Sequence, residues 1–287
     1  FKLLSPGNIQ LLITQSVFSA FISWGMMFIF SSGITDLSIG ANCILSANVG
    51  ILFAEYLGWG YPGLIIMTIL SVVIFEQITV HCAVTLKIPS WIAGLGMALV
   101  MESVTTAGLS AYLSGTNILR LDKYRALGKF PAMLIALVIG FIIASIVSDR
   151  AAIGNNIRAV GSSPHVAEAM GINKKKTILL GAVIGALFIG VGTIFQASYA
   201  GKFIPVSGMG SLSTIFNALA VVLLSGSFAK YISTSVGVLL GSILVTSIFN
   251  VLTLLGVPSG TWQQILLGAI VIACGMISGV RTKGVVK

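Results

Sequence analysis

The chain has 287 residues, of which 56% are hydrophobic and only 8% are charged. Soluble domains carry about 25% charged and about 45–50% apolar residues, so a water-soluble enzyme is excluded, and the hydrophobic content also excludes a disordered chain. The net charge of +9 comes from Lys and Arg in the gaps between apolar runs, which favours a role in membrane orientation over nucleic-acid binding.

Apolar segments long enough to span a membrane recur along the whole chain. Such a helix needs about 20 mostly apolar residues. About nine segments qualify, at residues 9–30, 41–58, 62–86, 88–112, 130–148, 177–198, 209–229, 231–255 and 260–280. They predict an all-α, polytopic helical bundle in which residues 1–287 form one transmembrane domain. The second segment is short and the seventh is rich in Gly and Ser, so either could be broken or re-entrant.

The basic residues between the segments set the expected orientation. The longest polar stretch, 149–176, carries Arg150, Arg158 and three lysines, and the C-terminal tail adds Arg281, Lys283 and Lys287. Four segments separate these regions, so both can face the cytoplasm. The basic loop 113–129 then lies outside, against the rule. Phe1 also lies outside, so we expect one further helix ahead of it.

The first polar break, from Ser31 to Gly40, contains Asp36 among small hydroxyl residues. An acid near membrane depth needs a partner, a water-filled cavity or helix N-terminal amides. Asp36 or Ser38 is predicted to cap the helix that begins near Gly40. A broken helix beside a substrate path uses the same geometry, and a purely structural cap is the alternative. Glu102 is the best candidate for an acid within the membrane, either lining a pathway or pairing inside the bundle.

The stretch 154–173 predicts a short helix in the loop 149–176. Ser163 is placed to cap it, Pro164 suits its first position, and Gly171 ends it. A helix this short is not stable alone. We expect it to dock on a partner through Val166, Ala169 and Met170, with attachment to the membrane surface as the alternative.

Two motifs carry a family resemblance. SSGITDLSIG, and IRAVGSSPHVAEAMGIN followed by a basic cluster, resemble the membrane permease subunits of ribose-type ABC sugar importers. GMGSLSTIFNALAVVLLSGS and GVLLGSILVTSIFNVLTLLGVPS are similar to the C-terminal half of that family. The resemblance covers essentially the whole chain, and its members normally have one further N-terminal helix. One departure is Thr35, inserted before Asp36, which would rotate Asp36 by about 100° in a helix.

The resemblance implies a permease subunit that moves a ribose-like monosaccharide across the bacterial inner membrane. It implies three partners in addition to lipid: a cytoplasmic ABC ATPase, an extracytoplasmic sugar-binding protein and a second permease chain, identical or related. The helix from Ser163 to Asn173 would couple to the ATPase. The residues assigned to coupling are Gly161, Ser163, Pro164, Ala167, Gly171 and Asn173. Those assigned to the substrate pathway are Asp36, Ser38 and Glu102.

Other chemistry has little support in the sequence. A phosphate-binding loop would need G-x-x-x-x-G-K-[ST], which is absent, so ATP hydrolysis is expected in a partner and this chain is not expected to be an enzyme. We expect no cofactor and no metal, because His81 and His165 stand alone on different segments. The alternatives are an importer of the same family for a nucleoside, an autoinducer sugar or a branched-chain amino acid, and an ion-coupled secondary transporter that depends on an acid such as Glu102.

Overall fold

The computed structural model describes residues 5–108, 118–229, 231–257 and 261–283. Phe1, Lys287, part of the loop 113–129 and the side chains of Arg281 and Lys283 lie outside the described residues. Within those ranges the regular structure is helical, apart from an isolated bridge between Arg120 and Lys202. The predicted all-α class is therefore confirmed.

Seven helices among the described residues are long and apolar enough to cross a membrane. They are α1 (Pro6–Ser31), α2 (Ile39–Ile51) continued by η2 (Leu52–Tyr56), α3 (Gly60–Leu86), α4 (Ser90–Ser103) continued by η3 (Val104–Gly108), α6 (Ala132–Ser145) continued by η5 (Ile146–Arg150), α9 (Lys174–Ala200) and α11 (Thr234–Leu254). Two further apolar helices are α10 (Leu212–Phe228) and α12 (Thr261–Lys283). Each of the predicted segments coincides with one of these helices.

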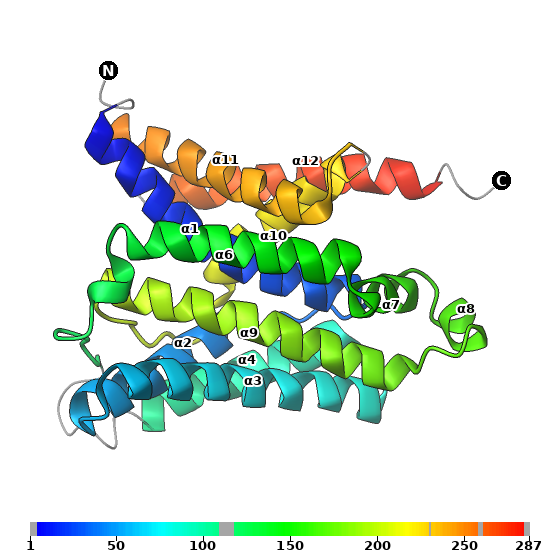
Figure 1. Cartoon of the computed structure of the whole chain (residues 1–287), viewed down its shortest axis with the longest axis horizontal. Helices are drawn as coiled ribbons and strands as arrows, with labels where there is room; N and C mark the ends of the chain where they lie inside the picture. Colours follow the sequence, from blue (N-terminus) through cyan, green and yellow to red (C-terminus); the bar gives the residue numbers. More distant parts are fainter. Residues whose placement is uncertain (1–4, 109–117, 230, 258–260, 284–287) are drawn as a thin grey trace.

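Three short helices lie outside these segments: η4 (Ala126–Gly128), α7 (Ala152–Ser162) and α8 (Pro164–Ala169). In Figure 1 the long helices run side by side between two ends of the molecule, and α7 and α8 project from one end. Helix α12 ends at that same end of the molecule, and α1 begins at the other. The chain thus crosses repeatedly between two faces, as a polytopic bundle must.

The centre of the bundle is an aromatic cluster between α1 and α9. Phe21 and Trp24 of α1 meet edge to face, with their ring centroids 5.5 Å apart, and both pack against Phe188 of α9. Trp24 is fully buried, and its indole Nε1 donates a hydrogen bond to the Ser235 carbonyl oxygen at 3.1 Å. This bond satisfies the indole N–H inside the bundle and ties α1 to the start of α11.

Helices α1 and α9 cross at two glycines. A Cβ at Gly185 would lie 2.7 Å from the Gly25 carbonyl oxygen, and one at Gly25 would lie 2.5 Å from the Gly185 carbonyl oxygen. These positions leave no room for a side chain. Small residues at such crossings let the backbones approach closely, which is a main source of helix association in lipid.

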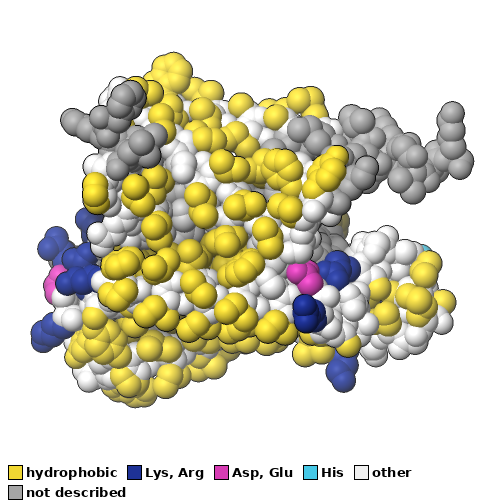
Figure 2. All heavy atoms as spheres, turned by 45° about the horizontal axis from the view of Figure 1, so that its top comes forward, with side chains coloured by type: hydrophobic (Ala, Val, Ile, Leu, Met, Phe, Trp, Pro, Cys, Tyr) yellow, Lys and Arg dark blue, Asp and Glu magenta, His cyan; other side chains and the backbone are white. Residues whose placement is uncertain are grey.

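The surface agrees with a membrane environment. Figure 2 shows hydrophobic side chains spread over the middle of the molecule and the Lys and Arg side chains gathered towards its two ends. Among the basic residues of the loop 113–129, Arg125 has a structural role. It donates to the carbonyl oxygens of Tyr199 at 2.6 Å and Ser198 at 3.3 Å, at the carboxyl end of α9. A cation at that end of a helix is favourable, which gives a local reason for one basic residue on the side the orientation rule disfavours.

We predict that Gly185→Ala lowers stability by about 1–3 kcal/mol, because the added methyl group collides with backbone atoms of α1. The matched control is Gly96→Ala on α4, where an added Cβ has open space and Ala favours the helix. Thermal unfolding of the two variants in detergent measures the difference. Equal unfolding temperatures would contradict a tight α1–α9 crossing.

Candidate functional site

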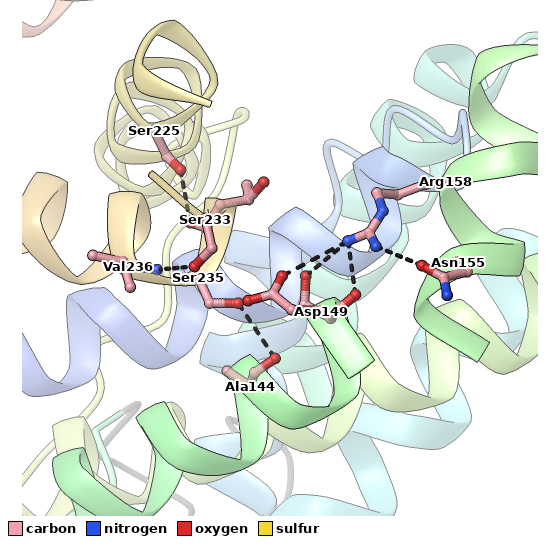
Figure 3. Close-up of polar contacts among 10 residues, drawn as sticks. Ala144, Asp149, Asn155, Arg158, Ser225, Ser233, Ser235 and Val236 are labelled. Atoms are coloured by element: carbon pink, nitrogen blue, oxygen red, sulfur yellow. Dashed lines mark hydrogen bonds and ion pairs between the residues drawn. The ribbon is translucent and has the colours of Figure 1, made fainter. Parts of the chain in front are cut away.

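The loop 149–176 is folded onto the end of the bundle by Arg158 of α7. Its guanidinium donates to the Ser148 carbonyl oxygen at 2.7 Å and to Asn155 Oδ1 at 2.7 Å, and it lies 3.8 Å from the Asp149 carboxylate (Figure 3). Ser148 and Asp149 belong to η5, the continuation of α6. Arg158 therefore joins the beginning of the loop to the membrane helix that precedes it.

Helix α7 was not predicted as a separate element. It buries Gly154, Ile157 and Val160, which share one face at a spacing of three residues. Next to this face, Gly161 approaches α1 so closely that a Cβ would collide with the Ser31 carbonyl oxygen. The recurrence of apolar residues at positions 153, 157 and 160 was the sequence signal for this helix.

Helix α8 begins and ends where the sequence predicts. Ser163 has the N-cap position and Pro164 the first helical position, although the Ser163 side chain makes no capping hydrogen bond. Gly171 follows the helix with φ = +80°, a conformation that glycine adopts without steric cost. Asn173 then caps α9, where its Oδ1 accepts a hydrogen bond from the Lys176 backbone N–H at 2.9 Å.

The two sides of α8 differ sharply. Ala167 is fully buried in a cluster with Val80, Val160 and Ile178, so its methyl group holds α8 against the bundle. On the other side, Val166 is 56% exposed and Met170 is 63% exposed. An anchored helix thus presents apolar side chains outward, at the tip of a loop that carries Lys174, Lys175 and Lys176.

Asp36 lies in the non-helical linker 33–38 between α1 and α2. Its side chain is fully buried; Oδ1 accepts from the Ser38 backbone N–H at 2.7 Å, and Oδ2 from the Ser38 hydroxyl at 3.0 Å. Ser38 has the N-cap position of α2 but its side chain makes no capping hydrogen bond, and Asp36 accepts from the Ser38 N–H just before the helix, so the predicted capping of the free N–H groups of α2 is not observed. Thr35 does not turn Asp36 within a helix, because this backbone is not helical and the exposed Thr35 is accommodated in the linker.

Glu76 of α3, which the sequence did not single out as a site residue, joins this group. Its side chain is fully buried, and its Oε1 atom has no hydrogen-bond partner among the described residues. Asn42 Nδ2 donates to Glu76 Oε2 at 3.4 Å and to the Val72 carbonyl oxygen at 3.1 Å. This polar cluster (Asp36, Ser38, Asn42 and Glu76) fastens α2 to α3.

Glu102 has a different position, at the turn that leads into α10. Its two carboxylate oxygens accept hydrogen bonds from the backbone N–H groups of Met209 and Ser211, both at 2.9 Å. Glu102 itself is only 3% exposed. A carboxylate in this place satisfies donors that would otherwise be unpaired and complements the positive end of the helix dipole.

The structure brings the two helix starts together. A Cβ on Gly40, at the beginning of α2, would collide with the Ser211 carbonyl oxygen just before α10. Asp36, Ser38 and Glu102 are thus buried near one another, and their described polar contacts are with the protein itself. In the described part of the chain, no group of three His, Cys, Asp and Glu side chains is placed to hold a metal ion.

A polytopic bundle with helices that begin inside it, and with one structured loop at its end, is typical of membrane transport proteins. The chain belongs to the family described as the permease component of the branched-chain amino acid transport system, whose model matches residues 8–275. Membership and the seven apolar helices make it a multi-pass protein of the inner membrane.

Curated relatives match over nearly the whole chain. The xylose transport system permease protein XylH of Escherichia coli (strain K12) is 22% identical, over 94% of this chain and 84% of its own length. The galactose/methyl galactoside import permease protein MglC of the same strain is 27% identical, over 94% of this chain and 85% of its own length. The probable ABC transporter permease protein YphD, also of that strain, is 25% identical over 95% and 83%. No solved structure matches the chain.

We predict that Glu102→Gln lowers stability by about 1–2 kcal/mol, because one of the two backbone N–H groups loses its acceptor. Glu168→Gln is the matched control, since Glu168 is an exposed residue of α8. Thermal unfolding in detergent compares the two. If Glu102→Gln unfolds at the wild-type temperature, the carboxylate is not needed at the start of α10.

Proposed function

We propose that this chain is the permease subunit of an ABC importer that carries a ribose-like monosaccharide across the inner membrane. A separate cytoplasmic ATPase drives the transport, and an extracytoplasmic binding protein delivers the sugar. The chain works as a pair with a second permease chain, identical or related. The relatives named for xylose and galactose import support the cargo class, and family membership supports the arrangement of subunits.

The observation that carries the coupling role is the outward apolar side of α8. Val166 and Met170 extend into solvent although α8 is anchored on its other side by Ala167. Exposed apolar side chains at the tip of a basic loop are suited to the hydrophobic groove of a partner protein. Gly161, Ser163, Pro164, Gly171 and Asn173 shape and end the docking helix, and Ala167 holds it in place.

The loop has connections through which movement of α8 can reach the membrane helices. It continues α6 through η5 and leads directly into α9. Gly161 touches the end of α1 at Ser31, and Ser235 at the start of α11 donates a hydrogen bond to the Ala144 carbonyl oxygen of α6 at 3.3 Å (Figure 3). An ATPase that moves α8 would thus displace the same ends of four membrane helices and shift the bundle between two states.

The placement of Glu102 argues against the ion-coupled alternative. Such a transporter needs an acid that binds and releases its ion during the cycle. Both oxygens of Glu102 accept backbone hydrogen bonds at the start of α10. Release of these bonds in each cycle would expose unpaired donors inside the bundle, so a structural role for Glu102 is the simpler account.

We predict that Val166→Asp and Met170→Asp each reduce sugar uptake roughly tenfold or more, because a charge is placed in an apolar contact. The amount of chain in the membrane is expected to stay unchanged, and the ATPase is expected to be lost from the purified complex. Ala152→Asp on α7 is the control, since it adds the same charge to an exposed position of the same loop. Wild-type uptake and ATPase binding by both α8 variants would contradict the docking role.

The cargo is tested with the complete importer, purified from native membranes with its partners and placed in proteoliposomes. We expect ATP-dependent uptake of a labelled monosaccharide from the set ribose, xylose and galactose, and none of leucine. An ionophore that abolishes ion gradients is expected to have no effect. Leucine uptake, or uptake by this chain alone along an ion gradient, would select one of the alternatives.

A further inference from the structure

A polar cavity of about 190 Å³ lies between α1, α9 and α10 and is not lined by Asp36 or Glu102. Its polar lining consists of five side chains: Ser19 of α1, Gln196 of α9, and Ser213, Thr214 and Asn217 of α10. Phe18 and Ile22 of α1 complete one wall. The α10 residues belong to the first two turns of that helix, directly after the turn held by Glu102.

Three atoms of this lining are buried without a hydrogen-bond partner: Ser19 Oγ, Gln196 Oε1 and Asn217 Oδ1. Ser19 is only 6% exposed. A buried polar atom without a partner costs about 1–3 kcal/mol, so three around one cavity indicate that something else supplies their hydrogen bonds. Lipid chains cannot do so, because they carry no polar groups.

The chemical character of the lining also limits which kind of molecule can occupy the cavity. All the described side chains that line the cavity are uncharged. An amino acid or an inorganic ion would bring charges that need opposite charges or strong dipoles in a buried site. A sugar is neutral and offers several hydroxyl groups, each of which can donate to one oxygen and accept from an amide or hydroxyl. The aromatic ring of Phe18 adds an apolar surface against which the C–H face of a sugar can lie.

The size of the cavity also favours a small sugar as its occupant. Sites for drug-sized ligands measure about 300–1,000 Å³. A cavity of about 190 Å³ suits a single sugar ring better than a disaccharide or a nucleoside.

We propose that the cavity between α1, α9 and α10 is a sugar-binding station on the translocation path, where Ser19, Gln196 and Asn217 hydrogen-bond the hydroxyl groups of a monosaccharide. This inference rests on the proposed transport function and adds to it the contact residues and the neutral character of the cargo. The cavity then discriminates against charged solutes in the permease itself.

The first experiment compares sugar transport with ATP hydrolysis in the same proteoliposomes, using labelled ribose, xylose and galactose. Asn217→Leu removes the amide at similar size, and Ser19→Ala removes one hydroxyl. Asn217→Leu is expected to reduce sugar transport about tenfold, and Ser19→Ala several-fold, while ATP hydrolysis stimulated by the loaded binding protein changes less than twofold.

The matched control is Ser23→Ala. Ser23 lies one turn further along α1, is fully buried and has an unpartnered hydroxyl, but does not line the cavity. Wild-type transport in this variant is expected. Unchanged transport in Ser19→Ala, or an equal loss in Ser19→Ala and Ser23→Ala, would overturn the proposal even if Asn217→Leu fails to fold.

The second experiment tests whether the cavity holds water and sugar. In a variant in which Cys43, Cys82 and Cys274 are replaced, Asn217→Cys and Ser213→Cys are exposed to a charged, membrane-impermeant thiol reagent. Rapid labelling that slows at least fivefold during sugar transport is expected. Leu244→Cys, 50% exposed on α11, is the lipid-facing comparison and should react slowly. Labelling as slow as Leu244→Cys, or labelling that sugar does not slow, would overturn the proposal.

The transport experiment distinguishes failure of the proposed function from failure of the sugar-binding cavity. If the wild-type complex transports none of ribose, xylose and galactose, the proposed function fails. If it transports one of them and the cavity variants match wild type, the sugar station fails and the proposed function stands.

Discussion

The structure depends on which groups accept hydrogen bonds from the backbone N–H groups where helices begin inside the bundle. Water is scarce there, so each such start needs an acceptor from the protein. Glu102 supplies two carboxylate oxygens before α10, and Asp36 supplies one to the Ser38 N–H before α2. Because Gly40 packs on the Ser211 carbonyl group, these two starts lie together.

Two functional features follow from this arrangement. The first turns of α10 are held in place by Glu102, so their polar side chains can line a cavity against α1 and α9. At one end of the bundle, Arg158 and Gly161 tie the loop 149–176 to η5 and α1. The proposed sugar station and the proposed docking helix are therefore connected by the same helices, α1 and α9, which is what coupling of two sites requires.

Much of the fold could be predicted from the sequence because lipid imposes simple rules. Apolar runs of spanning length located the membrane helices, and Pro164 and Gly171 marked the limits of α8. The glycines at the α1–α9 crossing and the hydrogen bond between Asn42 and Glu76 could not be derived in this way. Gly25 and Gly185 are 160 positions apart, and Glu76 sits in an apolar run that resembles the other spans. The direction of Asp36 could not be derived from the sequence either, because Thr35 lies in a linker and not in a helix.

The sequence by itself determined that this is a polytopic membrane protein and which loop carries the short helix α8, since hydropathy and turn residues act locally along the chain. Only the tertiary structure decided which buried polar groups have a hydrogen-bond partner and which do not. Glu102 and Asp36, which the sequence assigns to the substrate pathway, accept backbone hydrogen bonds where α10 and α2 begin, whereas Ser19, Gln196 and Asn217 have buried oxygen atoms without a described partner. That difference depends on which helices meet, because a hydrogen bond is decided by a few tenths of an ångström between residues far apart in the chain.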